Sequence, residues 1–427
     1  MTTRQIFPNR VRYISNPLAS NNQDQTRVTP PTLIAPVELR SPSDLPSSAP
    51  KPVRKPTLPA LTGIRTLLAI FIILFHFTPP HLGLLYPIID NAYVFVGFFF
   101  LISGFILTYN YADRATNLSK RDFWLARFSR LYPIYILVLA ISVHMLRDEW
   151  SSRSHAEFWQ GVILTPFLLQ GWSPTLATFG NTVAWTLSCE VMFYLAFPFL
   201  LYAWATRAHW LNTPVRLIAL IFTLWAFGLV PHLLYTIFNP DHLAAPADRY
   251  TSTYLLRFLK YTPPPYVCTF LVGVSLAKLH PLLPFTPRQR FFVAATALTL
   301  LGLFFYTGAV NHTPYLFLHG GLLVPLFSLL ILGLAGPNPI SSLFSIRPLV
   351  LLGEATFALY LLHFNVYILL HTYHIPDRLH LTWLDPWLSY AALLTLAYLA
   401  YRFVENPARI AILTRFSRKP KPAKLPI

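Results

Sequence analysis

The feature that most constrains this fold is a series of apolar segments, each long enough or nearly so to cross a hydrocarbon core of about 30 Å. We identify ten of them, at residues 61–78, 93–109, 131–146, 184–203, 217–237, 255–277, 291–309, 314–335, 348–370 and 386–405. Only 11% of the residues are charged, far below the usual level of about 25% in soluble domains. Because helices satisfy their own backbone groups in lipid, the sequence predicts an all-α polytopic membrane protein with about ten transmembrane helices.

The basic residues are concentrated in alternate loops. When the N-terminus is placed in the cytoplasm, 26 of the 33 Lys and Arg residues fall on that side, 6 fall on the opposite side, and Arg65 lies within the first segment. The positive-inside rule then predicts that both termini are cytoplasmic. This topology accounts for most of the net charge of +17, so we expect no nucleic-acid partner.

The two ends of the chain differ from the apolar segments between them. Residues 1–57 are rich in Pro, Ser and charge and predict a disordered cytoplasmic tail, either simply solvated or bound to a partner. Residues 58–410 are expected to form the membrane domain. Residues 411–427 are expected to form a basic tail against anionic lipid head groups. The extreme N-terminus has no apolar signal-peptide region, so we expect the first span to remain as an uncleaved anchor.

One apolar stretch is too short to be counted as a span. It lies between Arg147 and Thr182 and is interrupted by Gly161 and Pro166. We interpret it as a re-entrant or interfacial segment on the outer face. It leads into the fourth span and is therefore placed to cover a site there.

Arg65 and His76 are the only side chains in the first segment, LTGIRTLLAIFIILFHFTP, that can carry charge. Such residues are costly inside a membrane and usually functional. Eleven residues amount to nearly three helical turns, so both side chains share one helix face, about 16 Å apart along the axis. The pattern predicts a reaction centre with a fixed cation near one surface and an imidazole deep in the span.

Three further ionisable residues lie in or at the ends of later spans. Glu190 is the only one in the fourth span, and its expected partner is Arg65 or His76. His363 lies well inside the ninth span and acts either in helix packing or directly at the site. Glu405 is most simply a residue at a helix end, bonded to nearby basic groups.

Two short motifs complete the set. Arg127 and Arg130 in FWLARFSRLYP lie on one helix face at the cytoplasmic entry to the third span. Their guanidinium groups suit phosphate, although ordinary anchoring at the membrane surface is an equal alternative. In VFVGFFFLISGFIL, the small residues Gly97, Ser103 and Gly104 allow another backbone to approach closely.

Taken in order, these motifs resemble the acyltransferase-3 family of integral membrane O-acyltransferases, which includes O-antigen and exopolysaccharide O-acetylases. The matching segments are LTGIRTLLAIFIILFHF, FVGFFFLISGFIL, FWLARFSRLYP, NTVAWTLSCEVMFY, LGEATFALYLLH and VENP, and the resemblance covers about residues 58–410. Two departures occur. Thr186 stands where serine is usual, and Glu354–Ala355–Thr356 stands where many relatives have a Ser-Tyr pair. We expect the second to be tolerated, with an effect on the acceptor side.

The resemblance implies an enzyme with no bound cofactor that uses cytoplasmic acyl-CoA, usually acetyl-CoA, as co-substrate. The acyl group would pass to a hydroxyl of a glycan, a lipid-linked sugar or a small natural product. Arg127 and Arg130 would bind the CoA phosphates, and Arg65 would bind a phosphate or the pantetheine, or pair with Glu190. His76 would be the general base, a role worth about 10²–10⁴-fold in rate and suited to an imidazole with an ordinary pKa of about 6.5.

The same resemblance places Glu190 among the catalytic residues, and Ser103, Trp185 and His363 among the substrate-binding ones. Ser103 and Cys189 are alternative covalent nucleophiles, but direct transfer is simpler. The expected location is the plasma membrane, the inner membrane of a bacterium, in contact with membrane lipids. No periplasmic hydrolase-like domain follows, so we expect transfer to be completed within the membrane domain or by a separate partner.

Three outward histidines, His371, His374 and His380, are expected to line the acceptor entrance rather than to bind a metal. Two other functional classes stay open. One is a proton-coupled transporter in which Glu190, His76 and His363 form a proton relay. The other is a non-enzymatic scaffold that presents the N-terminal tail.

Overall fold

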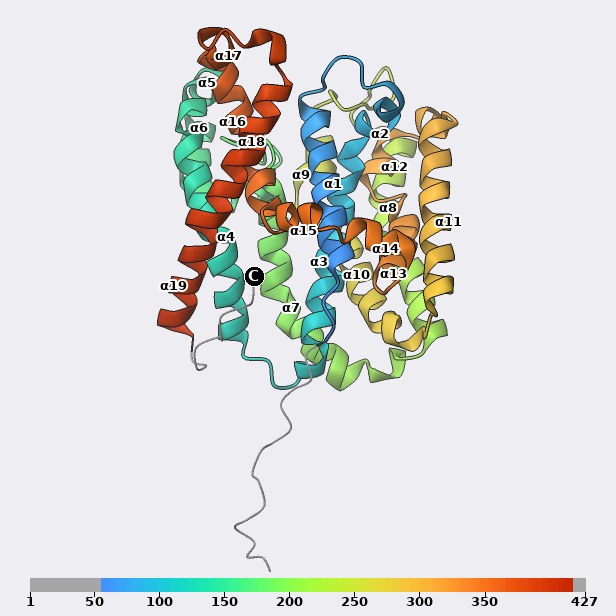
Figure 1. Ribbon diagram of the computed structural model, residues 1–427. Coiled ribbons are helices and arrows are strands. Elements are labelled where there is room, and N and C mark those ends of the chain that lie inside the picture. The colour runs from blue at the N-terminus through green and yellow to red at the C-terminus, as the bar shows by residue number, and fades with distance from the viewer. Residues whose placement is uncertain (1–54, 418–427) are drawn as a thin grey trace, which may run out of the picture. The chain divides into compact units, whose positions relative to one another are not determined.

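The computed structural model describes residues 55–417, and no β-strand occurs among them (Figure 1). The predictions for residues 1–54 and 418–427 lie outside this range. Eight helices of the described part are long and apolar enough to cross a membrane, or nine if one bent pair is counted as a single span. The predicted class, an all-α polytopic membrane protein, is confirmed.

The helices that form the main part of the candidate spans are α1 (Pro59–His76), α3 (Phe95–Tyr111), α4 (Lys120–Ser142), α7 (Trp185–Arg207), α8 (Pro214–Phe238), α11 (Pro287–Tyr306), α13 (Val324–Leu334), α16 (Thr356–Thr372) and α18 (Trp387–Ala400). The other helices extend or connect them and are α2 (Tyr86–Ile89), α5 (Leu146–Ser152), α6 (His155–Leu164), α9 (Tyr254–Tyr261), α10 (Val267–Leu279), α12 (Tyr315–His319), α14 (Pro339–Phe344), α15 (Arg347–Glu354), α17 (Ile375–Arg378) and α19 (Asn406–Phe416).

The expected span at 255–277 is not a continuous helix. Residues 263–265 are three consecutive prolines, which cannot donate the backbone hydrogen bonds of a helix interior. The chain therefore divides into α9 and α10. Helix α10 is largely buried and packs against both α3 and α8, which explains why a short helix carries so apolar a sequence.

Glycines set the contact between α3 and α10. A Cβ atom at Gly104 would lie 2.2 Å from the carbonyl oxygen of Phe270, and one at Gly273 would lie 2.2 Å from that of Leu101. The two backbones thus approach more closely than any side chain would permit, which is a common way for helices to associate in membranes. The close approach expected at the small residues of this helix occurs at Gly104 but not at Gly97, where no atom lies within 4 Å of the Cβ position.

The second close approach fixes α1 against α14 and α15. A Cβ atom at Gly63 would lie 1.8 Å from the carbonyl oxygen of Phe344, and one at Gly353 would lie 2.6 Å from that of Thr62. Figure 1 shows α14 and α15 lying across the direction of the long helices. The chain then bends by 68° between α15 and α16, and α16 also packs against α1.

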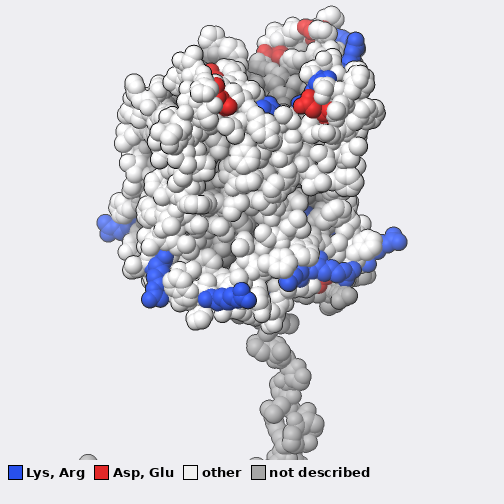
Figure 2. Space-filling model, turned by 180° about the vertical axis from the view of Figure 1, so that it is seen from behind, with Lys and Arg blue, Asp and Glu red and all other residues white. Residues whose placement is uncertain are grey.

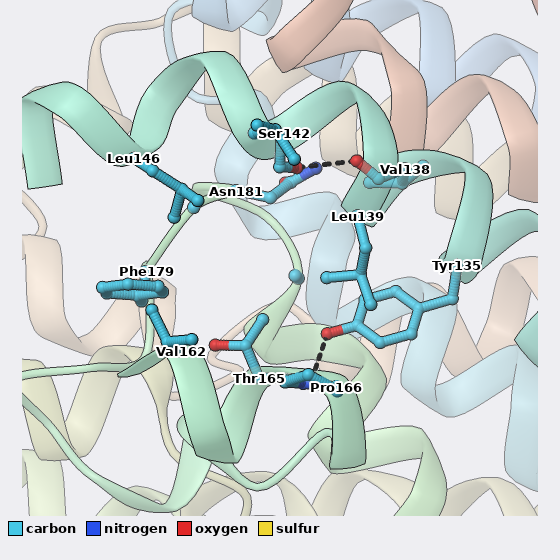
Figure 3. Close-up of a pocket in the computed structure, with 13 residues that line it drawn as sticks. Tyr135, Val138, Leu139, Ser142, Leu146, Val162, Thr165, Pro166, Phe179 and Asn181 are labelled. Atoms are coloured by element: carbon cyan, nitrogen blue, oxygen red, sulfur yellow. Dashed lines mark hydrogen bonds between the residues drawn. The ribbon is translucent and has the colours of Figure 1, made fainter. Parts of the chain in front are cut away.

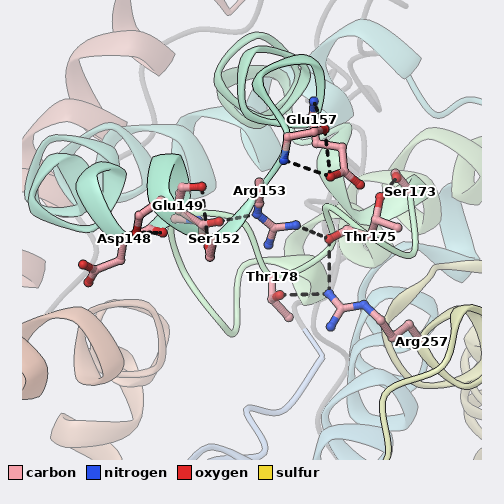
Figure 4. A network of polar contacts seen from close by, with 12 residues as sticks. Asp148, Glu149, Ser152, Arg153, Glu157, Ser173, Thr175, Thr178 and Arg257 are labelled. Atoms are coloured by element: carbon pink, nitrogen blue, oxygen red, sulfur yellow. Dashed lines mark hydrogen bonds and ion pairs between the residues drawn. The ribbon is translucent and has the colours of Figure 1, made fainter.

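The stretch between Arg147 and Thr182 contains short helices followed by irregular chain, as its interrupted sequence indicates. Two arginines hold the irregular part in place (Figure 4). Arg153 pairs with Glu149 and donates a 2.8 Å hydrogen bond to the carbonyl oxygen of Thr175. Arg257 donates to the same oxygen at 3.3 Å and to the hydroxyl of Thr178 at 3.1 Å. The segment that leads into α7 is therefore fixed at several points.

Charged side chains are unevenly distributed over the two ends of the helical unit. Figure 2 shows lysines and arginines in a belt around one end, while most of the visible acidic side chains lie at the other end, with further basic ones, around a hollow. This asymmetry is typical of a protein that spans a bilayer. The assignment of the basic end to the cytoplasm stays a prediction.

The glycine contacts between α3 and α10 can be tested by adding single methyl groups. We expect Gly104→Ala and Gly273→Ala each to destabilise the protein by about 1–3 kcal/mol, because the backbones must separate. Gly97→Ala is the matched control on α3, since no atom lies within 4 Å of its Cβ position. Thermal unfolding in detergent measures the effect. Equal melting temperatures for the three variants would contradict the proposed close packing.

Candidate active site

Two histidines on different helices contact each other. His76 is the last residue of α1, nearer the helix end than its predicted position deep in the span. Its Nδ1 atom lies 3.2 Å from Nε2 of His363 in α16 and 3.0 Å from the carbonyl oxygen of Ile72. The Nδ1 atom of His363 lies 2.6 Å from the carbonyl oxygen of Tyr360. The structure thus brings together two residues that the sequence singled out separately.

These contacts define the protonation pattern of a neutral pair. A carbonyl oxygen only accepts, so Nδ1 of His363 carries a proton and its Nε2 carries a lone pair. Nδ1 of His76 must then donate, both to that lone pair and to the carbonyl oxygen of Ile72. In a neutral imidazole the other nitrogen is an acceptor. Nε2 of His76 is therefore the basic nitrogen, and His363 orients it.

Aromatic rings surround the histidine pair. The rings of Phe75 and Phe364 contact that of His76 at centroid distances of 5.2 and 5.7 Å. Phe77 stacks on Tyr367 at 3.8 Å. His363 is fully buried, whereas His76 is only half-buried. A general base needs this combination of a fixed ring and an accessible nitrogen.

Arg65 belongs to a second polar cluster, toward the start of α1. Its charge interacts with those of Arg130, Glu190 and Glu405. It is half-buried, and it forms neither an ion pair nor a hydrogen bond with any residue between 55 and 417. A guanidinium group without a hydrogen bond to the described residues has donors that suit an anionic or polar ligand.

Glu190 is held by a residue that the sequence analysis did not select. The hydroxyl of Tyr194, one turn further along α7, donates a 3.0 Å hydrogen bond to its carboxylate. The charges of Arg65 and Arg130 influence Glu190, but the described residues contain no ion pair with either and no hydrogen bond from Glu190 to His76. Of the two predicted partners, Arg65 thus acts on Glu190 through its charge without direct contact, and the described residues contain no hydrogen bond that joins Glu190 to the histidine pair.

The two arginines of the third span differ in their surroundings. Arg127 lies within 6 Å of the rings of Tyr111, Phe123 and Tyr194, and donates a 3.4 Å hydrogen bond to the Tyr111 hydroxyl. Its Nε atom is buried without a hydrogen-bond partner among the described residues. Arg130 is half-buried beside the cluster. Both residues therefore retain donors that a ligand can use.

Glu405 is a member of this cluster that the sequence placed only at a helix end. It is 3% exposed, and one carboxylate oxygen has no hydrogen-bond partner in the described part of the chain. It lies in a π-helical turn, Tyr401–Glu405, between α18 and α19. Such turns often mark functional positions. The charges of Arg65, Arg130 and Arg409 act on it, so it balances part of the positive charge.

Trp185 and Ser103 occupy different environments. Trp185 is buried at the start of α7 and packs on Tyr261 and Tyr266, with ring centroids at 5.5 and 5.3 Å. Ser103, in α3, is half-buried and forms no hydrogen bond with a described residue. The substrate-binding role of both residues stays a prediction.

A separate pocket of about 170 Å³ opens between α4, α6 and the segment that precedes α7 (Figure 3). Its lining is mainly apolar and includes Tyr135, Val138, Leu139, Val162, Phe179 and Asn181. None of the predicted site residues lines this pocket, so it is distinct from the histidine pair and from the arginine cluster.

Two of the three histidines at 371–380 contact carboxylates. His371 contacts Asp385 at 2.9 Å, and His374 contacts Asp377 at 3.1 Å. Within residues 55–417, no group of three or more His, Cys, Asp or Glu side chains is arranged to hold a metal ion.

Comparison with known proteins gives a consistent result. A family model described as an acyltransferase domain, of the acyltransferase-3 type, matches residues 58–402. The acyltransferase MdmB of Streptomyces mycarofaciens is 29% identical over 333 residues, which cover 74% of this chain and 80% of that protein. No solved structure shows a significant match.

Two further relatives are longer proteins. The peptidoglycan O-acetyltransferase OatA of Listeria monocytogenes is 24% identical over 82% of this chain, and a putative O-acetyltransferase of Staphylococcus aureus is 25% identical over 82%. The present chain spans only 56% and 57% of their lengths. The family match itself covers most of the helical unit, and this protein therefore belongs to the acyltransferase-3 family of membrane acyltransferases.

Proposed function

We propose that this protein is an acyl-CoA-dependent O-acyltransferase that moves an acyl group, most simply acetyl, to a hydroxyl of a glycan, a lipid-linked sugar or a small natural product. The observation that carries the proposal is the orientation of His76 by His363, which leaves Nε2 of a half-buried imidazole as a base. The proposed location is the plasma membrane, with the basic end of the helical unit facing the cytoplasm.

The donor end of the proposed site is the arginine cluster. Arg65, Arg127, Arg130 and Arg409 carry four positive charges against the two carboxylates of Glu190 and Glu405. The surplus of positive charge suits the phosphates of CoA, which guanidinium groups bind through paired hydrogen bonds. These residues supply binding and position rather than bond-breaking chemistry.

The acceptor end of the proposed site is the histidine pair. The acceptor hydroxyl gives its proton to Nε2 of His76 as its oxygen attacks the thioester carbonyl. The new C–O ester bond forms and the C–S bond breaks. The proton then passes from His76 to the departing CoA thiolate. The lone pair of His363 on the other side of the ring stabilises the transient imidazolium.

The two ends are joined by one helix. Arg65 and His76 lie on the same face of α1, about 16 Å apart along its axis. The pantetheine arm of CoA is long enough to bridge most of that distance, so the phosphates and the thioester can occupy the two clusters at once. Direct transfer in this arrangement needs no covalent intermediate on Ser103 or Cys189.

Donor binding is the first prediction. Calorimetry on the purified protein in detergent is expected to show acetyl-CoA binding that is lost in Arg127→Ala/Arg130→Ala, because the phosphates lose two guanidinium partners. Arg114→Ala/Arg207→Ala is the control, since both residues are exposed and outside the cluster. Absence of binding by well-folded wild type, for acetyl-CoA and for longer acyl-CoAs, would exclude the donor assignment.

The roles of the two histidines give the second prediction. His76→Ala should reduce acyl transfer by about 10²–10⁴-fold without weakening acetyl-CoA binding. His363→Gln, which keeps an acceptor atom, should retain more activity than the similarly bulky His363→Phe. Transfer of radiolabelled acetyl groups into the membranes of expressing cells measures the activity. Equal activities of the two His363 variants would show that its lone pair does not orient His76.

A further inference from the structure

An ion pair stands beside the histidine site and is unused by the mechanism above. Asp90, just after α2, pairs with Arg249 in the loop before α9. The side chain of Asp90 is 30% exposed and that of Arg249 is 31% exposed. Exposed ion pairs contribute little to stability, about 0–1 kcal/mol. Stability alone therefore does not account for this pair.

Hydrogen bonds from buried and neighbouring side chains fix the backbone of the loop that carries Arg249. Lys260 is 1% exposed and donates hydrogen bonds of 3.1 and 3.2 Å to the carbonyl oxygens of Arg249 and Thr251. Asp248 accepts further hydrogen bonds from the backbone of Tyr250 and Thr251. Burying an ammonium group is costly. The hydrogen bonds of the buried Lys260 ammonium group fix the backbone from which the Arg249 side chain extends.

The guanidinium group lies over the aromatic wall of the site. Its central carbon is 5.3 Å from the ring centre of Phe75, whose ring meets that of His76 edge-on at 5.2 Å. Phe75 also contacts Tyr93, with ring centroids at 5.8 Å. The ion pair is thus separated from the proposed catalytic base by a single aromatic ring.

Most of the hydrogen-bonding capacity of the pair is unused. A guanidinium group has five N–H donors. Within residues 55–417, Arg249 uses one nitrogen, for Asp90, and the second carboxylate oxygen of Asp90 has no partner. Burial lowers the pKa of Arg249, but the hydrogen bond and charge of Asp90 raise it by more, so Arg249 keeps its charge beside the Asp90 carboxyl group.

We infer that Asp90 and Arg249 form the acceptor subsite of this enzyme and that the subsite takes a neutral molecule with several hydroxyl groups. Neighbouring hydroxyls both donate and accept, and the pair offers a free acceptor and free donors side by side. The aromatic faces of Phe75 and Tyr93 supply apolar contact next to them. Because the two charges cancel, the subsite gives no advantage to an anionic acceptor. The inference rests on the proposed function and names the acceptor class for it.

The test uses the purified protein in detergent with acetyl-CoA and simple acceptors. Methyl glucoside and methyl mannoside represent neutral polyols, and 1-butanol represents a single hydroxyl. We expect Asp90→Asn and Arg249→Gln to raise KM for the glycosides by about 10–100-fold, the effect of losing hydrogen bonds to a charged group. KM for acetyl-CoA and the transfer to 1-butanol should not change.

Matched controls and a reversed pair separate recognition from structure. Arg147→Gln and Asp148→Asn replace exposed residues near the start of α5 and should leave KM for the glycosides unchanged. The reversed pair, Asp90→Arg/Arg249→Asp, keeps the attraction between the loops. It should therefore keep the wild-type melting temperature but not restore KM.

Four results would overturn the inference. The first is an unchanged KM for the glycosides in the single variants, and the second is full recovery of KM in the reversed pair, which indicates a structural role. The third is a wild type that binds acetyl-CoA but acetylates neither glycoside, which excludes the acceptor class and leaves the donor function intact. The fourth is a wild type that does not bind acetyl-CoA, which removes the proposed function as well.

Discussion

Ionisable side chains are costly inside a hydrocarbon layer and almost always face the interior of the helical bundle, and α1 carries two such side chains on one face. Arg65 and His76 therefore require two polar clusters, one toward each end of the helix. The remaining helices are arranged to provide them. α4, α7 and α19 contribute charges to the first cluster, and α16 contributes the histidine of the second.

The close contacts of α1 make this arrangement possible. Gly63 and Gly353 allow α1 to touch α14 and α15 backbone to backbone. The bend of 68° after α15 then directs α16 along α1. A larger residue at either glycine would move α16 outward and separate His363 from His76. The position of the histidine pair thus depends on the packing of α14 and α15 against α1.

The sequence predicted the parts of the site that lie on single helices. The shared face of Arg65 and His76, and the pairing of Arg127 with Arg130, follow from helical spacing. The same helical spacing also places Tyr194 one turn after Glu190, on the same face of α7, so this contact was predictable from the sequence as well. The contact between the two histidines was not predictable, because 287 residues separate them and no local pattern encodes the contact.

The loops and helix breaks were the least predictable parts. The three consecutive prolines at 263–265 are incompatible with a continuous helix over 255–277. The high hydropathy of the whole segment nevertheless favoured a single span. The ion pair of Asp90 and Arg249 joins loops 159 residues apart. Its members look like ordinary surface charges in the sequence, and only the fold places them over Phe75 beside His76.

The proposed donor and catalytic residues lie on helices, whereas the proposed acceptor residues lie on loops, and the chemistry of the two substrates explains this division. The proposed donor, acyl-CoA, carries its phosphates and its thioester a fixed distance apart, so its contacts can be built on rigid helices. Acceptors vary, and side chains on loops can change without disturbing the packing of the spans. In the proposed arrangement, such an acyltransferase would keep its arginine cluster and histidine pair while the loops around Asp90 and Arg249 would set the acceptor.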